Sequence, residues 1–583
     1  MAGKKTNIKK NNIIQLLVGI AVIVLLNVIG SYVFTRFDLT SEKRYSLSDQ
    51  TKEVLRNLDD YVFFKVYLEG EFPAGFKRLR NATKEMLDEF RAYSDFVQYE
   101  FINPSESGDQ KERNTIYQLL MEKGLSPTDL QVKTNEGMSQ KIIFPGAIVT
   151  YGSKENVVEL LRTQVGIPPE QQLNNSIQTL EYNLANAISK LTQEKKPRIA
   201  ILRGQGELND RQMADILYTL SENYALESIT LNQEISSLSE RTSVDTSKTR
   251  VINKFDALVV AKPDSVFNER DKFIIDQFVM RGGKILWLID PVFASMDSIQ
   301  NKESTVGITQ SLNIADQLFN YGVRLNSNLV MDLTAVPIPL NVGSMGGQPQ
   351  IEFFPWYYFP LITPTVKHPI TNNLNAIKTE FVSSLDTTRV ENVQKTILLK
   401  TSPYSRVINT PAFITLRVLR EEPDESKYRG PEQPIAVLLE GKFESVYKNR
   451  IPPVIANNKD IAFMESSVPT KMIVVSDGDI IKNQFHYKDG YPLPLGYDQY
   501  TGQTYGNKEF IMNAISYLVD DSELISSRTR EFKLRLLDKS KVNDNRLLVQ
   551  LANVILPVVL LLLFGLVRAS LRKRRYSKSW KTD

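Results

Sequence analysis

The 583-residue chain contains no cysteine and only two histidines. The missing thiol excludes disulfides, zinc–thiolate sites, iron–sulfur clusters, cysteine nucleophiles and a lipidated cysteine anchor. With only His368 and His486 available, a histidine-based triad or metal cluster has few possible members, and we interpret both as surface or loop residues. Hydrophobic residues (42%) and charged residues (24%) occur in ordinary proportions for a globular protein. A chain of this length is expected to form two or three domains.

Nucleotide-binding and nucleophile motifs are also missing. No G-x-x-x-x-G-K-[ST] motif occurs, which excludes ATP hydrolysis by a P-loop, and no G-x-S-x-G elbow occurs. The stretch KPRIAILRGQGELNDRQMADIL (196–217) has the pattern strand, glycine turn, helix. A dinucleotide fingerprint starting at Gly204 would need a glycine at position 209, where the chain has Asn209, so we interpret the turn as structural. The sequence therefore predicts no cofactor, no metal, no catalytic residue and no enzyme activity.

Excess positive charge is confined to the two ends of the chain. The formal net charge is +4, but residues 1–12 carry +4 and residues 568–583 carry +6, which leaves −6 for everything between them. The basic total therefore gives no indication that nucleic acid is a partner.

Two uncharged apolar runs adjoin these basic tails. Residues 13–34 and 547–567 are 22 and 21 residues long, and about 20 residues are enough to cross the hydrocarbon core. The first run is too long for a signal peptide, and no Ala-x-Ala-like cleavage site follows before Arg36, so it predicts an uncleaved anchor. The positive-inside rule places both tails in the cytoplasm. Residues 36–545 then lie in the periplasm, and the protein is expected in the bacterial cytoplasmic (inner) membrane with the lipid bilayer as a partner.

The first periplasmic domain, residues 36–195, has the element order β-α-β-α-β-β-α. That order resembles the thioredoxin fold, and Pro145 falls just before a predicted hairpin, where that fold keeps a cis-proline. The redox cysteine pair is missing, so the resemblance concerns the fold alone. The expected strands are 61–68, 97–102 and two within 141–161, and the expected helices are 76–93, 110–123 and 174–192.

The second periplasmic domain, residues 196–520, alternates strands and helices, and a juxtamembrane segment, 521–546, follows it. Continuous apolar strands in such an alternation indicate a parallel, doubly wound sheet. Asp477 and Asp479 in SDGD could hold a metal ion, but a turn after a strand uses Asp and Gly for its own hydrogen bonds, and we interpret the motif as a turn. The expected strands are 225–231, 255–261, 284–289 and 471–475, the expected helices are 269–281 and 508–519, and the region beyond about 330 is irregular and strand-rich.

Two aromatic stretches are candidate contact surfaces. FFPWYYFP (353–360) has the aromatic density of a sugar- or peptide-binding platform, although packing in a half-buried strand is the commoner use of such a run. The loop YPLPLGYDQYTGQTYGNKEF (491–510) is a candidate partner surface, because long ordered loops in compact domains are often functional. The candidate platform residues are Phe354, Trp356, Tyr357 and Tyr358, and the candidate partner contacts in the loop are Tyr497, Tyr500 and Tyr505.

Polar residues inside the two apolar runs are further candidate contacts. Asn27 and Asn553 each lie about 10 Å below the outer surface of the hydrocarbon core if both runs are helices. A carboxamide that faces lipid there is costly, so each is expected to face protein. With Gln550 and Ser31 they predict a buried polar seam, formed between the two helices or with another membrane subunit. The alternative is that both are tolerated close to the interface with water.

Four segments carry a resemblance to a known family: RFDLTSEKRYSLSDQTKEVLRNL (36–58), the stretch 255–291, LNIADQLFNYGVRLNSNLVMD (312–332) and the 491–510 loop. The chain resembles the GldG family of gliding-motility-associated ABC transporter auxiliary (substrate-binding-like) proteins along essentially its whole length. The resemblance implies a membrane protein that works with a separate ATPase subunit and a separate permease subunit. It also implies that the central domain is similar to class I glutamine amidotransferase-like domains, with the fold retained and the nucleophilic cysteine absent.

Two functions follow as hypotheses. The first is a non-enzymatic auxiliary subunit of an ABC-transporter-like complex linked to gliding motility or cell-surface secretion, with two α/β domains in the periplasm. The alternative is a periplasmic glycan- or peptide-binding protein that uses the 353–360 platform. A hydrolase is disfavoured because the nucleophile motifs are missing.

Overall fold

The computed structural model describes residues 8–32, 46–520, 524 and 545–577, apart from 135–136, 162–167, 194, 246–247, 301, 303, 346–347, 420–421 and 459. The chain divides into two compact units, one formed by Met1–Arg44 with Glu531–Asp583 and the other by Tyr45–Arg530. The second unit is a mixed α/β structure.

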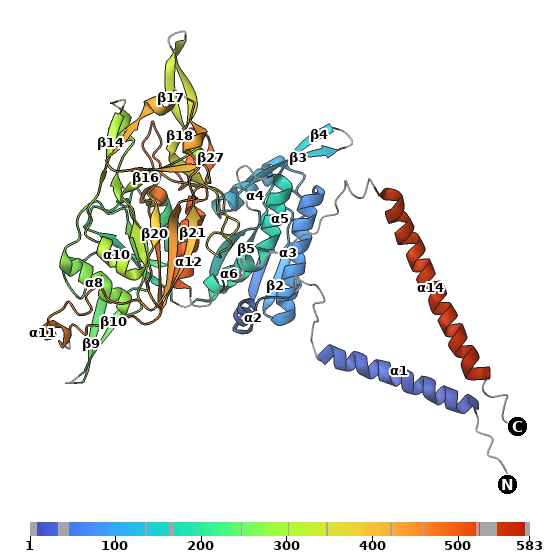
Figure 1. The fold of residues 1–583 in the computed structure, drawn as a ribbon. Coiled ribbons are helices and arrows are strands. Elements are labelled where there is room, and N and C mark those ends of the chain that lie inside the picture. The colour runs from blue at the N-terminus through green and yellow to red at the C-terminus, as the bar shows by residue number, and fades with distance from the viewer. Residues whose placement is uncertain are drawn as a thin grey trace. The chain divides into compact units, whose positions relative to one another are not determined.

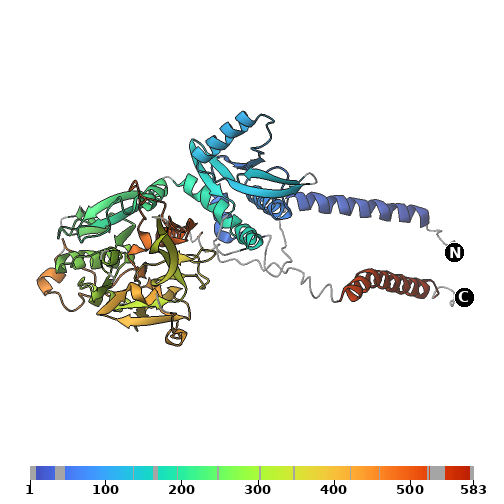
Figure 2. The ribbon, with the colours of Figure 1, turned by 90° about the horizontal axis from the view of Figure 1, so that it is seen from above.

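The described residues of the first unit form the helices α1 (Ile8–Tyr32) and α14 (Arg546–Ser577), each drawn as one continuous ribbon (Figures 1 and 2). Within α14, Gln550–Arg574 is long and apolar enough to cross a membrane. Among the described side chains of α1, the apolar stretch is Ile13–Leu25, which is shorter than a full span. The second predicted span therefore meets the length requirement, and the first stays a prediction.

The large unit begins with a four-stranded sheet in the order β2-β1-β5-β6. β1 pairs parallel with β2 and antiparallel with β5. Alternate residues of β5 enter different clusters: Ala147 and Val149 pack with α2, α3, α5 and α6, whereas Ile148 packs with α4. Both faces of the sheet are therefore covered. The elements are α2 (Asp49–Arg56), β1 (Val62–Val66), α3 (Ala74–Tyr93), β2 (Val97–Phe101), α4 (Gln110–Glu122), β3 (Thr128–Thr134), β4 (Gly137–Ile143), β5 (Gly146–Tyr151), β6 (Lys154–Glu159), α5 (Pro169–Gln178) and α6 (Leu180–Thr192).

Three features of this part differ from the sequence-based expectation. The hairpin β3–β4 was not predicted, and the single helix expected over 174–192 is two helices that meet at Thr179. Of the peptide bonds that the structure describes, only Thr410–Pro411 is cis, so the cis-proline expected at Pro145 is wrong. The thioredoxin fold itself stays a prediction.

A seven-stranded sheet in the order β21-β24-β25-β12-β11-β7-β8 forms the centre of the large unit. Its five strands from β8 to β25 run parallel, and β24 and β21 add antiparallel pairs at one side. These elements are β7 (Arg198–Arg203), α7 (Ala214–Asn223), β8 (Ala225–Thr230), β11 (Ala257–Ala261), α8 (Glu269–Met280), β12 (Lys284–Leu288), α10 (Ala315–Tyr321), β21 (Val393–Lys400), β24 (Pro434–Gly441), β25 (Thr470–Val475) and α12 (Asn507–Val519).

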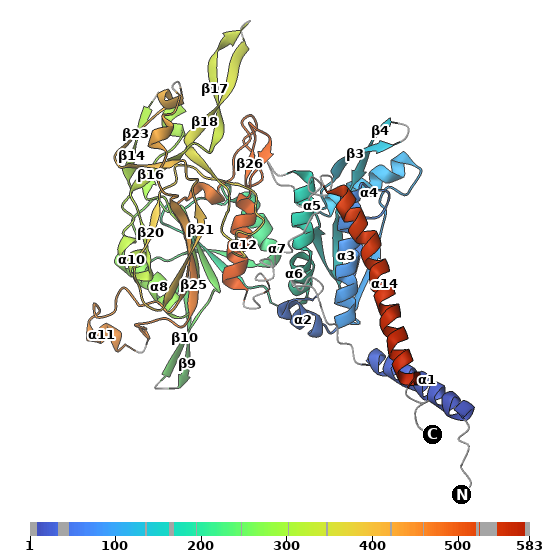
Figure 3. The same ribbon diagram turned by 45° about the vertical axis from the view of Figure 1, so that its right-hand side comes forward.

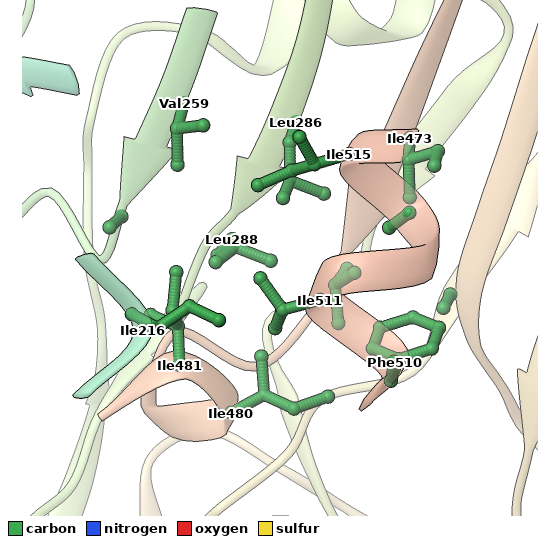
Figure 4. Packing of buried hydrophobic residues seen from close by; sticks show 14 of the residues in the cluster. Ile216, Val259, Leu286, Leu288, Ile473, Ile480, Ile481, Phe510, Ile511 and Ile515 are labelled. Carbon is green, nitrogen blue, oxygen red and sulfur yellow. The ribbon is translucent and has the colours of Figure 1, made fainter. Parts of the chain in front are cut away.

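The apolar strands bury both of their faces. In β12, Leu286 and Leu288 pack with residues of α7 and α12, while Ile285 and Trp287 pack with α8 and α10. Figure 4 shows Ile511 and other residues of α12 lying against this face of the strands. Burial on both sides explains why the strands have continuous apolar sequences with no polar alternation. The amidotransferase-like identity of this domain stays a prediction.

A β-rich region packs around a separate aromatic core. Its long hairpin, β17 (Ala335–Met345) and β18 (Gln348–Ile362), extends away from the remaining strands (Figure 3). The other short elements of the large unit are β9 (Ser239–Asp245), β10 (Lys248–Asn253), β13 (Val292–Phe293), α9 (Asp297–Gln300), β14 (Ser304–Thr309), β15 (Val323–Leu325), β16 (Asn328–Asp332), β19 (Ile377–Lys378), β20 (Leu385–Thr387), β22 (Ser405–Asn409), β23 (Ala412–Thr415), α11 (Pro453–Ala456), β26 (Tyr497–Asp498), β27 (Gln503–Thr504) and the 3₁₀ turns Leu416–Leu419, Glu425–Lys427 and Asp479–Ile481.

Candidate functional site

The carboxyl edge of the seven-stranded sheet is a candidate ligand site, because open α/β sheets bind ligands outside the carboxyl ends of their parallel strands. The chain leaves β7 at Gly204, β11 at Lys262, β12 shortly before Asp290 and β25 shortly before Asp477. Charged and turn-forming residues therefore gather at this edge.

Lys262 holds the centre of a buried ion cluster. Its ammonium group lies 3.1 Å from Asp290 Oδ2 and donates a hydrogen bond to Asp479. Lys482 contacts the other oxygen of Asp479 at 3.2 Å. The backbone of Lys262 is left-handed, with φ +54°, which costs a non-glycine residue about 1 kcal/mol. A Cβ on Gly478 would lie 2.6 Å from Lys262 Cβ, so this position needs glycine.

The pKa shifts follow from burial and from these contacts. Burial raises the pKa of Asp290 to about 6, and it raises the pKa of Asp477 well above its ordinary value. Burial would also raise the pKa of Asp479, but the charges of Lys262 and Lys482 outweigh it and hold that pKa below its ordinary value. Lys262, in turn, keeps a raised pKa because Asp290 and Asp479 outweigh its own burial. The cluster is thus an internally neutralised network.

This arrangement bears directly on metal binding. Carboxylate oxygens of Asp290, Asp477 and Asp479 lie within 4.8 Å of one another, as in a metal site. The Lys262 ammonium group, however, already contacts two of the three carboxylates. Asp477 uses its oxygens for the backbone, accepting from Asp479 N–H at 2.8 Å and from Glu380 N–H at 2.9 Å. SDGD is therefore the hydrogen-bonded turn that the sequence predicts, with a lysine where a cation would sit.

The glycine turn after β7 is closed by backbone contacts. Gly204 and Gly206 have φ values of +111° and +74°, and a Cβ on Gly206 would lie 1.5 Å from Asp264 Oδ1. The carbonyl of Gln205 accepts hydrogen bonds from Asp264 N–H and Ser265 N–H, both at 3.0 Å. The loops after β7 and β11 are thus joined at the point where the strand order reverses, which is where a doubly wound sheet opens for a ligand.

The 491–510 loop is fixed to the same edge through charge. Lys378 contacts Glu380 at 3.2 Å and the buried Asp498 at 3.6 Å. Asp498 accepts backbone hydrogen bonds from Tyr500 and Thr501, both at 3.0 Å, so it organises its own turn. Of the predicted partner contacts, Tyr500 is exposed, Tyr497 is half-buried and Tyr505 is buried in the aromatic core.

The aromatic platform predicted over 353–360 is wrong for three of its four residues. Trp356, Tyr357 and Tyr358 are buried, and Phe354 is half-buried. Their side chains are core to the β-rich region, because strands β13, β16 and β23 pack against them. This is the strand-packing alternative that the sequence left open.

The polar seam predicted within the two apolar runs lies partly outside the described side chains. Asn27 lies in α1, and its side chain falls outside the described residues. Asn553 and Gln550 lie in α14 and are exposed in the chain alone. The seam stays a prediction.

An exposed apolar patch, which sequence reasoning missed, lies on the three-stranded sheet β13-β14-β23. Phe293 pairs with Ile308 and Val306 pairs with Phe413, so the four side chains share one face. Each is between 45% and 64% exposed. Gly307 on the opposite face contacts the core. The three strands contain no charged residue, and such a surface is typical of the centre of a protein interface.

The hairpin β17–β18 adds to the uncharged surface of this region. Ile351 and Phe353 are exposed on its projecting part, and Glu352 is its one charged residue. Tyr358 at its base donates a hydrogen bond to the Phe413 carbonyl at 3.4 Å, which connects the hairpin to the patch. Pro337 and Pro339 in β17 lack N–H donors, which disfavours pairing with an added strand.

Comparison with known proteins gives one full-length relative. An uncharacterized protein of Borreliella burgdorferi is 22% identical over 576 residues, covering 97% of this chain and 99% of that protein. Among solved structures, the mmIFT52 N-terminal domain (12% identity, TM-score 0.30) covers 56% of this chain and 98% of its own length. A thua-like protein from Parabacteroides merdae (10% identity, TM-score 0.24) covers 59% and 94%. Both TM-scores are below 0.5, so neither establishes a common fold.

Two family models match the chain. Residues 41–150 match a domain of unknown function. Residues 196–514 match the family described as an ABC-type uncharacterized transport system, and this match spans more than half of the 583 residues. The chain therefore belongs to the family of auxiliary proteins of this ABC-type transport system and has a transporter-associated accessory role.

Proposed function

We propose that the chain is a non-enzymatic auxiliary subunit that works with a separate ATPase subunit and a separate permease subunit. In this proposal both termini are cytoplasmic, α1 and α14 cross the cytoplasmic membrane, and residues 36–545 lie in the periplasm. Family membership and the apolar length of α14 support the coarse assignment to a membrane transport complex.

The observation that carries the non-enzymatic part is the occupied carboxyl edge of the large sheet. Lys262 neutralises Asp290 and Asp479, and Asp477 is bonded to the backbone. The loops after β7 and β11 are bonded to each other. The buried charges of this edge, which an α/β enzyme would direct at a substrate, are here paired with one another or with the backbone, so this part of the edge acts as a fixed scaffold.

The apolar patch supports a partner of defined chemistry. A surface formed by Phe293, Val306, Ile308 and Phe413, without a charged residue in its three strands, fits an uncharged apolar surface on another subunit of the complex. An anionic membrane surface fits poorly, because polybasic segments bind such surfaces and this sheet carries no lysine or arginine. A GldG-like link to gliding motility or cell-surface secretion extends the proposal, and it is supported by the resemblance of the four sequence segments.

Copurification tests the proposal. The tagged full-length chain, extracted with a mild detergent from its own cells, is expected to retain an ABC ATPase and a permease identified by mass spectrometry. ATP hydrolysis is expected in that complex and absent from the chain alone. Recovery of the chain without either subunit, or turnover by the chain alone that a point substitution in it abolishes, would overturn the proposal.

The patch has its own variant and control. Replacing both Ile308 and Phe413 by serine is expected to reduce recovery of the partner subunits at least fivefold, because truncated interface centres each cost more than about 1 kcal/mol. Tyr218→Ser removes a single, more exposed aromatic residue from α7 and serves as the control. If the unaltered chain, the Ile308/Phe413 double variant and Tyr218→Ser recover the partner subunits equally well, the patch is not part of the interface.

A further inference from the structure

A cavity of about 470 Å³ lies in the first α/β part of the large unit. It is lined by the loops that follow the parallel strands β1 and β2, by the first half of α4 and by the end of β4. The carboxyl ends of parallel strands are a usual place for ligands, and the volume falls within the range of small-molecule sites. The cavity lies within the region that matches a domain of unknown function.

One face of α4 gives the cavity its chemistry. Gln110, Arg113, Asn114 and Tyr117 line it at spacings of three, four and seven residues, which places them on one side of the helix. This face carries the exposed carboxamides of Gln110 and Asn114 together with a half-buried guanidinium group and a half-buried phenol. The helix instead makes its core contact through Leu120 and its neighbours.

The wall formed by the β2 loop is fixed to α4 by hydrogen bonds. Ser105 Oγ lies 2.8 Å from Tyr117 OH, and Ser105 N–H donates to Asn103 Oδ1 at 3.1 Å. Arg113 donates to the carbonyl of Ser107 at 2.6 Å. The wall that carries Asn103, Arg113 and Tyr117 is therefore positioned in advance, which lowers the entropic cost of binding against it.

Other polar groups around the cavity remain available. The carboxamides of Gln110 and Asn114 and the carboxylate of Glu71 line the cavity and are exposed. Phe72, which is half-buried, and Ile142, which is 38% exposed, supply apolar surface beside them.

This lining disfavours two ligand classes. Charges of both signs line the cavity, Glu69 and Glu71 with Arg113 and Lys141, so it has no excess positive charge for a phosphate or other anion. The Asp109 carboxylate already caps the first turn of α4, accepting from Lys111 N–H at 2.9 Å. An apolar ligand would bury carboxamides without partners, which costs free energy for each one. The ligand must instead offer many neutral groups that both donate and accept.

We propose that this cavity binds a neutral saccharide. Vicinal hydroxyls both donate and accept, as the carboxamides of Gln110, Asn114 and Asn103 do. The Glu71 carboxylate accepts from a further hydroxyl, and the Phe72 ring packs against the apolar face of the sugar ring. The proposal does not depend on the accessory role in transport, because the cavity lies outside the 196–514 family match.

Calorimetric titration tests the proposal on the full-length chain. The protein is held in a detergent without a sugar headgroup, since a maltoside or glucoside would compete for the site. The probes are maltotriose, cellotriose and N,N′,N″-triacetylchitotriose, and a neutral tripeptide, triserine, is the comparison ligand. Saturable binding of at least one trisaccharide is expected, with triserine inactive.

Variants then locate the binding. Asn114→Leu and Gln110→Leu are each expected to weaken the trisaccharide two- to tenfold, the effect of losing hydrogen bonds to neutral groups. Gln118→Leu, one turn further along α4 and outside the lining, is the matched control, and unchanged melting temperatures verify folding. Absence of binding to all three trisaccharides, preference for triserine, or equal affinity in the folded Asn114 and Gln110 variants would each overturn the proposal. Success or failure of the copurification experiment has no bearing on this result.

Discussion

Substituting Lys262 by methionine tests the idea that the sheet edge is an internally neutralised scaffold. Methionine is similar in length to lysine but uncharged, so the change leaves Asp290 and Asp479 without their shared cation. Removing one partner of a buried ion pair typically costs about 3–5 kcal/mol. The Lys262 side chain is 25% exposed, so solvent screens part of the loss. We expect a loss of stability of about 3 kcal/mol in this domain.

The assay is the thermal unfolding of the full-length chain, followed by tryptophan fluorescence. Trp287 lies in β12 and Trp356 in the β-rich core, and both are fully buried, so both probes report on this part of the chain. A loss of 1 kcal/mol shifts the midpoint of a large domain by about 2–4 °C. The expected decrease in the midpoint is therefore about 6–12 °C at neutral pH.

A compensating variant separates charge from packing. Adding Asp290→Asn to Lys262→Met removes the carboxylate that has lost its cation, whereas Asp479 keeps its contact with Lys482. Most of the lost stability is therefore expected to return. Mg²⁺ or Ca²⁺ is expected to stabilise Lys262→Met more than the unaltered chain, because a cation can replace the ammonium group. A wild-type midpoint in Lys262→Met, or a double variant Lys262→Met/Asp290→Asn less stable than Lys262→Met alone, would refute the reasoning.

Three further outcomes are expected. Burial lowers the pKa of His368 to about 4, so as the pH falls the imidazole is protonated in the unfolded chain before it is protonated in the folded chain. The free energy of unfolding should therefore decrease from about pH 6.5 to pH 4. His368→Gln should make that decrease smaller in melting curves measured across this pH range. A reporter active only in the periplasm should fail at either terminus and work at residues 246–247, between β9 and β10, whereas activity at the C-terminus would contradict the two-span topology. Leucine at both Asn27 and Asn553 should lower the recovery of the permease while the melting midpoint of the large unit stays unchanged; full recovery would remove the polar seam from assembly.

The parallel part of the large sheet could be predicted because each of its strands has a recognisable local sequence pattern. Residues 257–261 and 285–289 are apolar at successive positions, a pattern that strands covered on both faces require. Helix α8 was predicted for a similar reason, since apolar periodicity ends at Gly282, whose φ of +88° suits a helix end.

The hairpins were missed because their sequences carry little local signal. β9–β10 is rich in charged and hydroxyl residues, and β17 contains two prolines that argue against a strand. The break at Thr179 was also missed, because apolar residues continue at helical spacing on both sides of it. In each case pairing or packing with distant residues decides the outcome.

The composition of the candidate site could be predicted only in part. SDGD was correctly interpreted as a turn, since its hydrogen bonds are local. Lys262 was not singled out, because its partner Asp479 lies 217 residues further along the chain. The exposed apolar patch was not predicted for the same reason, because Phe293 and Phe413 become neighbours only through the pairing of β14 with β13 and β23.

The sequence alone determined what depends on composition and on neighbours in the chain: the excluded chemistries, the apolar length of α14, the alternation of strands and helices and the turn at SDGD. The tertiary structure decided which side chains meet and which are covered. It buried Trp356, exposed Phe413 and placed the Lys262 ammonium group between two carboxylates. The physical reason is that burial and ion pairing depend on contacts between residues far apart in sequence. The local periodicity of the sequence does not indicate which distant residues make those contacts.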